Sequence, residues 1–155
     1  MSIVKSILLA TELATRRRDQ AAAVLAQAQK TEVFAQGQLA QLEGYGVETE
    51  SNWIRSAQAS TAPELMRNHY QFMARLGEAI GLQKNALQNA GRQVAREKKA
   101  LLETELRLSS LKKILAIKQT EIERVQAKRD QKQMDEFAAL QYSRSMAERN
   151  QGESL

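Results

Sequence analysis

Apolar side chains recur at every seventh position through the second half of the chain. The row consists of Met66, Met73, Ile80, Leu87, Val94, Leu101, Leu108, Leu115 and Ile122. Because an α-helix has 3.6 residues per turn, such a row stays against a partner helix only if the two helices wind around each other with a left-handed twist. The pattern therefore predicts a coiled coil, whose functional surfaces lie along its sides and not in a catalytic cleft.

A weaker pattern of the same kind precedes this row. Alternating steps of three and four connect Val4, Ile7, Thr11, Ala14, Arg18, Ala21, Leu25, Ala28, Glu32, Ala35, Leu39 and Leu42. Most of these side chains are apolar, and the alanines among them allow two helices to approach closely. We expect a first helix over residues 3–43, ended by Gly44 and Gly46, because glycine commonly follows the last turn of a helix.

Residues 44–62 are expected to connect the two helices. Trp53 and Ile54 form a short apolar face in this segment, so a partly helical connection is an alternative to a loop. Thr61 is placed to cap the second helix, and Pro63 suits a first turn. We expect this helix to run over residues 63–143 and the polar tail, residues 144–155, to fray.

The predicted fold class is all-α: a two-helix antiparallel coiled-coil hairpin with a longer second helix, forming a single domain over residues 1–155. A short connection favours antiparallel neighbours. The companion row of the second helix is half polar: Leu76, Gln83, Ala90, Glu97, Thr104, Leu111, Lys118 and Val125. If the first helix ends near Gly44, the second lacks an intramolecular partner beyond about Leu108. The apolar row continues there, which implies another protein or self-association.

The composition agrees with long helices and argues against an enzyme. There is no cysteine, which excludes disulfides and thiolate zinc sites. His69 is the only histidine, and no phosphate-binding glycine loop occurs. We therefore expect no catalytic residue, no cofactor and no metal. No run is long and apolar enough for a membrane span, and the first residues lack a signal-peptide pattern.

Charge is distributed unevenly along the chain. Residues 1–30 hold five basic and two acidic groups, residues 31–91 four and six, and residues 92–155 fourteen and ten. A hairpin would bring its two basic ends toward one pole, where an acidic partner is expected. Nucleic acid is a poor alternative because no aromatic stacking platform accompanies the basic groups. The turns from Ile3 to Leu13 are amphipathic and have a basic polar face, so binding of this segment to a membrane surface stays an alternative.

Two local patterns resemble the flagellar FliJ family. One is Asp130-Gln131-Lys132-Gln133-Met134-Asp135-Glu136-Phe137-Ala138, and the other joins Leu13-Ala14, Asp19, Ala21-Ala22 and Leu25. The resemblance implies a small antiparallel coiled coil of the flagellar type III export apparatus. It also implies a stalk inserted in the export ATPase ring, which contacts the large membrane protein of the export gate and empty substrate chaperones.

The resemblance implies an export-gate contact around the hairpin bend. The matching positions are Gln38, Leu42, Tyr45, Phe72, Leu76, Ala79 and Gln83. The heptad pattern offers an alternative for part of this set, because Leu42 and Leu76 fall on the predicted seams. Phe72 lies one step off the seam, which makes it the better binding candidate.

Basic residues near both ends are candidates for contact with acidic loops of the ATPase ring. They are Arg16, Arg17, Arg18, Arg124, Lys128, Arg129 and Lys132. We expect a cytoplasmic, non-enzymatic protein that is held peripherally at the inner membrane through the export apparatus. The equivalent stalk of a virulence secretion system, and a generic coiled-coil export chaperone or structural protein, are the alternatives.

Overall fold

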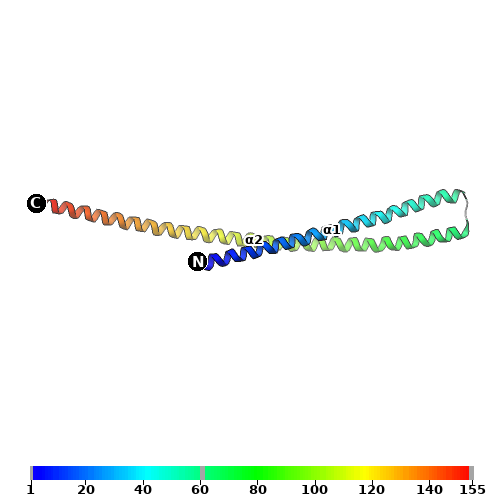
Figure 1. Cartoon of the computed structure of the whole chain (residues 1–155), viewed down its shortest axis with the longest axis horizontal. Coiled ribbons are helices and arrows are strands. Elements are labelled where there is room, and N and C mark those ends of the chain that lie inside the picture. The colour runs from blue at the N-terminus through cyan, green and yellow to red at the C-terminus, as the bar shows by residue number, and fades with distance from the viewer. Residues whose placement is uncertain (1, 60–61, 154–155) are drawn as a thin grey trace. The chain divides into compact units, whose positions relative to one another are not determined.

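The computed structural model describes residues 2–59 and 62–153, which form two helices (Figure 1). Helix α1 spans Ser2–Ala59 and helix α2 spans Pro63–Glu153. The helices form an antiparallel hairpin in which α2 is longer, and the described part of the chain contains no strand. The predicted fold class is confirmed. Within the same residues, neither helix has a stretch long and apolar enough to cross a membrane.

The predicted start of α2 is correct. The carbonyl oxygen of Ala62 accepts hydrogen bonds from the backbone N–H groups of Leu65 at 3.1 Å and Met66 at 3.2 Å. Pro63 is the first helical residue, where its missing N–H costs no intrahelical bond. The predicted capping residue, Thr61, lies outside the described residues.

The predicted end of the first helix is wrong. Helix α1 continues through Gly44 and Gly46 to Ala59, so most of the expected connecting segment is helical. No described glycine has a positive φ, which is the conformation that a glycine stop requires. A glycine inside a helix costs only about 0.5–1 kcal/mol. Gly46 lies close to the opposite helix, and an added Cβ would be in ordinary van der Waals contact with Leu76 Cδ2 at 3.5 Å.

The tail of α2 also differs from the prediction. We expected fraying from residue 144, but α2 is helical to Glu153. Helix-forming residues such as Met146, Ala147 and Glu148 continue into this segment, and no proline or glycine interrupts it before Gly152.

The core follows the predicted seams. All twelve predicted positions of α1 are buried or half-buried, with Ala14, Ala28 and Ala35 the most enclosed. On α2 the buried side chains are Leu76, Val94 and Leu108. The two ends of the seven-residue row, Met66 and Ile122, are exposed. The alternation of three and four along each helix therefore predicted the interface.

The contacts divide the chain into two compact units, which we describe separately. The hairpin unit is Ala14–Arg107, which includes the bend. The terminal unit contains the described residues of α1 up to Leu13 and those of α2 from Leu108 onward.

In the terminal unit, α2 is partly covered as far as Lys118. From Gln119 to Glu153 every described residue is exposed. We call residues 119–153 the overhang. The expectation that α2 loses its partner beyond Leu108 is thus wrong by about three turns, because α1 is longer than predicted and covers more of α2.

Candidate protein interaction surfaces

The seven predicted gate-contact residues all lie in the hairpin unit, but they differ in accessibility. Three are exposed, namely Gln38, Tyr45 and Phe72. Three are half-buried, namely Leu42, Ala79 and Gln83, and Leu76 is buried. Leu76 packs beneath Gly46 in the seam. The alternative interpretation of Leu42 and Leu76 as seam residues agrees with this burial.

Gln83 and Gln38 form a polar link across the two helices. The Nε2 group of Gln83 donates hydrogen bonds to the backbone oxygen of Ala35 at 2.9 Å and to Oε1 of Gln38 at 3.2 Å. A polar seam residue with satisfied hydrogen bonds fixes the register of two helices. The amide nitrogen of Gln83 is therefore occupied within the hairpin.

Tyr45 and Phe72 are the two aromatic members of the predicted gate set, and each is 48% exposed. The hydroxyl oxygen of Tyr45 accepts a hydrogen bond of 3.1 Å from Gln41 Nε2. The expectation that Tyr45 follows the end of the first helix is wrong, because α1 extends to Ala59. At 1.5 Å per residue, Tyr45 lies about 20 Å before that end, so this surface is on the side of the hairpin and not at its bend.

The seven predicted ring-contact residues fall into both units. Arg16, Arg17 and Arg18 belong to the hairpin unit. Arg18 is half-buried on the seam and forms an ion pair of 2.8 Å with Asp19. The remaining four lie in the overhang and are exposed: Arg124, Lys128, Arg129 and Lys132. We treat these two groups as separate basic surfaces.

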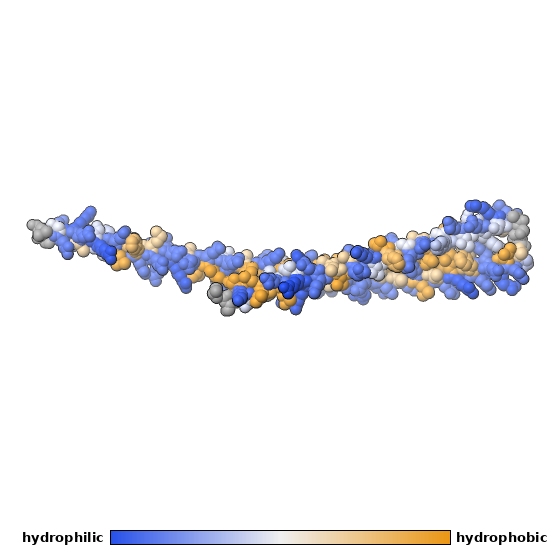
Figure 2. Space-filling view, viewed as in Figure 1, coloured by the Kyte–Doolittle hydropathy of each residue, from blue (hydrophilic) through white to orange (hydrophobic). Residues whose placement is uncertain are grey.

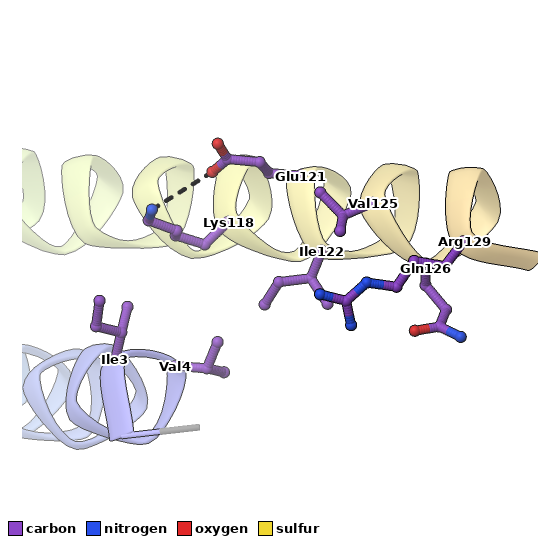
Figure 3. A pocket seen from close by; sticks show the side chains of 8 residues that line it. All are labelled: Ile3, Val4, Lys118, Glu121, Ile122, Val125, Gln126 and Arg129. Carbon is purple, nitrogen blue, oxygen red and sulfur yellow. Dashed lines mark hydrogen bonds and ion pairs between the residues drawn. The ribbon is translucent and has the colours of Figure 1, made fainter. Parts of the chain in front are cut away.

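The beginning of the overhang combines basic and apolar side chains. Ile3 and Val4 of α1 face α2 across a cleft that is lined by Ile122, Val125 and Arg129 (Figure 3). Next to it, Lys118 Nζ lies 3.4 Å from Glu121 Oε2. Ile122 and Val125 stay largely exposed although they continue the seam rows. This arrangement suits a partner protein that packs against Ile122 and Val125 and binds basic side chains beside them, such as Arg129.

The overhang also carries an apolar cluster that the sequence interpretation did not treat as a surface. Met134, Phe137 and Ala138 line a shallow depression on α2, and Met134 and Phe137 are strongly exposed. These residues belong to the C-terminal pattern that resembles the FliJ family. Their spacing of three and four could have identified them as one face of the helix.

The described residues offer no group of side chains that could hold a metal ion. Within residues 2–59 and 62–153, no three histidine, aspartate or glutamate side chains are grouped so that they could hold a metal ion. His69 instead stacks on Trp53 of the other helix, with ring centroids 4.3 Å apart and planes inclined by 7°. Its observed role is thus packing between the helices near the bend.

The fold and its surfaces define the class of protein: a two-helix coiled-coil hairpin that exposes apolar and basic side chains along its helices. The chain matches the family model described as "Flagellar FliJ protein" over residues 9–147, and it belongs to that family. Membership makes it a component of the flagellar export apparatus. Comparisons with curated proteins and with solved structures gave no match.

Proposed function

We propose that the protein is a stalk that inserts its overhang into the ring of the flagellar export ATPase and contacts the export gate through the side of the hairpin unit. The observation that carries the proposal is the exposure of α2 from Gln119 to Glu153. Helices in proteins gain most of their stability from tertiary packing, which the overhang largely lacks within this chain. A helix of this length that carries exposed apolar groups therefore fits a partner that surrounds it.

The charge of the overhang supports a ring with acidic loops. Arg124, Lys128 and Lys132 are spaced by four residues, so they form one row along the helix. Single charge pairs exposed to water contribute only about 0–1 kcal/mol. A row of such pairs orients a helix in a channel without fixing it in one position, as a stalk that changes its contacts requires.

Gate binding is assigned to the exposed members of the predicted set. Tyr45 and Phe72 offer half-exposed aromatic rings, and Gln38 lies one heptad before Tyr45 on the same face. Leu76 and Gln83 support this surface from the seam. Through these contacts the protein would be held at the cytoplasmic face of the inner membrane. Empty substrate chaperones are further proposed partners, without a surface assigned to them.

The family match favours the flagellar stalk over the equivalent stalk of a virulence secretion system. A generic chaperone role would require binding of one exported substrate. The stalk role instead requires binding of the assembled ATPase ring, so the two roles predict different partners.

Removal of residues 119–155 tests the proposal. Because the described residues of the overhang are all exposed, the truncated hairpin should stay folded and unfold only a few degrees earlier than the full chain, through loss of the partly covered Ile122 and Val125. It should lose binding to the purified ATPase ring, measured by fluorescence anisotropy. Ring binding of undiminished affinity by the truncated, folded hairpin would refute insertion of the overhang.

A further inference from the structure

The hairpin unit has a second exposed surface, which shares no residue with the predicted gate contact. It is a shallow groove between α1 and α2. Its apolar part is formed by Val47 and Ile54 of α1 and by Met73 and Ile80 of α2. Val47 is 72% exposed and Ile54 is 54% exposed. Hydrophobic side chains gather along the two helices of this unit toward the bend (Figure 2).

The groove and the aromatic gate surface flank the seam on opposite sides. Glu43, Val47, Glu50 and Ile54 follow steps of four, three and four, so they form one stripe on α1. At 100° per residue this stripe lies about 170° around α1 from Tyr45. A partner in the groove and a partner on Tyr45 would therefore not compete for the same face.

A glycine lies beside the groove on α2, between its two lining residues of that helix. Gly77 lies between Met73 and Ile80, four residues after the first and three before the second, and so on the same helical stripe. A Cβ added at Gly77 would meet no atom within 4 Å. The backbone is therefore uncovered at this point, and another helix can approach it without a clash.

Two carboxylates alternate with Val47 and Ile54 along the same stripe of α1. Glu43 and Glu50 both line the groove, and neither takes part in either ion pair found in the described residues, which are Arg18–Asp19 and Lys118–Glu121. Residues 31–59 contain four glutamates and one arginine. The groove thus combines apolar side chains from both helices with two carboxylates of α1, which are complementary to a positively charged partner.

We propose that this groove docks a basic amphipathic helix of another protein. Aliphatic side chains at spacings of three and four would cover Val47, Ile54, Met73 and Ile80, while lysines or arginines on the flanks would meet the two glutamates. The overhang of a second copy is a poorer fit, because residues 119–153 carry seven acidic and six basic groups. The inference does not depend on insertion into the ATPase ring.

The test titrates the full-length protein into a labelled helical peptide built from leucines at spacings of three and four with lysines on both flanks. A second peptide carries glutamate in place of every lysine. Fluorescence anisotropy should show binding of the lysine peptide and no binding of the glutamate peptide. Equal affinity for both peptides would overturn the charge argument and with it the proposal.

Two variants place the binding in the groove. Gly77→Leu places a large side chain beside Met73 and Ile80, where it would obstruct a docked helix, and should weaken binding by about tenfold or more. It should not harm the hairpin, because leucine favours the helix more than glycine does. Its matched control is Gly44→Leu, also at an exposed helical glycine with open space around it, and this variant should bind like the original protein.

The charges are tested in the same way. Glu43→Lys combined with Glu50→Lys should weaken binding, whereas Glu48→Lys combined with Glu78→Lys changes the net charge equally at exposed sites outside the groove and should not. Equal loss in both pairs, or full binding by Gly77→Leu, would overturn the proposal. Concentration-dependent self-association that Gly77→Leu abolishes would assign the groove to a second copy and likewise overturn it.

Discussion

Two positions of the seven-residue row look equivalent in the sequence, but truncation of their side chains should lower the free energy of unfolding by very different amounts. Leu108 and Ile122 lie fourteen residues apart in the same seven-residue row. Leu108 is only 4% exposed, whereas Ile122 is 52% exposed. The perturbation is a single alanine substitution at either position, which deletes three carbon atoms in each case. The contrast tests the finding that α1 no longer covers α2 beyond Lys118.

The expected magnitudes follow from burial. Replacing a buried leucine by alanine costs about 2–5 kcal/mol, and a thin two-helix core can partly close the cavity, so we expect about 3 kcal/mol for Leu108→Ala. At about 0.8 kcal/mol per buried CH₂ group, the deletion at half-exposed Ile122 should cost about 1 kcal/mol. The free energy of unfolding would come from urea titrations followed by circular dichroism.

Equal losses at the two positions would refute this reasoning. They would mean that Ile122 is covered in solution, either by more of α1 or by a second chain. Repeating the titration at several protein concentrations separates these cases, because only a second chain makes the midpoint depend on concentration. Ile122→Ala should also weaken binding to the ATPase ring, while Leu108→Ala should affect binding only through loss of folded protein.

Two further predictions concern the proposed partners. Reversal of Arg124, Lys128 and Arg129 to glutamate should abolish the salt-sensitive part of ATPase-ring binding without changing the thermal midpoint, since all three side chains are exposed. Phe72→Ala combined with Tyr45→Ala should weaken export-gate binding by about tenfold or more in a titration. The double variant should melt only slightly earlier than the original protein, because both rings are about half exposed.

Matched controls decide between charge effects and site effects in these experiments. Exposed lysines of the hairpin unit, Lys84, Lys98 and Lys99, can be reversed together as a control for the triple variant. Ring binding that falls equally in both triple variants would show a general dependence on net charge. For the aromatic pair, a large loss of helical stability with intact gate affinity would show that both rings are core residues.

The seams were predictable because burial in a coiled coil repeats with the sequence. Each seam position contacts the partner helix for the same geometric reason, so a row of apolar residues identifies the whole interface. Even polar members such as Gln83 and Arg18 could be placed by their spacing. The start of α2 was also predictable, since Pro63 is chemically suited to the first turn.

The end of α1 could not be predicted because glycine has two opposite roles. Gly44 and Gly46 favour a helix stop only if the backbone adopts a left-handed conformation. In the structure they remain helical, and Gly46 lies in the seam against Leu76 of the opposite helix. That second role depends on a side chain thirty positions away, which local sequence does not contain. Because the end of α1 was predicted too early in the chain, the bend and the start of the uncovered part of α2 were predicted too early as well.

The docking groove was missed because its two walls come from different helices. On α1 alone, Val47 and Ile54 look like scattered exposed apolar residues, which are common on protein surfaces. Only the antiparallel pairing places Met73 and Ile80 beside them. The acidic flank could have been noticed, because Glu43 and Glu50 lie one heptad apart on the same stripe.

Separate surfaces allow the proposed contacts to be tested independently. The overhang has no described buried residue, so charge changes there, such as those at Arg124 and Lys128, should alter binding of the ring without weakening the seam. Tyr45 and the groove lie on opposite sides of α1, so a change in either leaves the other face intact. Seam variants such as Leu108→Ala act on folding and would reduce every contact together. A variant that loses one partner and keeps the others therefore identifies a surface, whereas a uniform loss identifies the core.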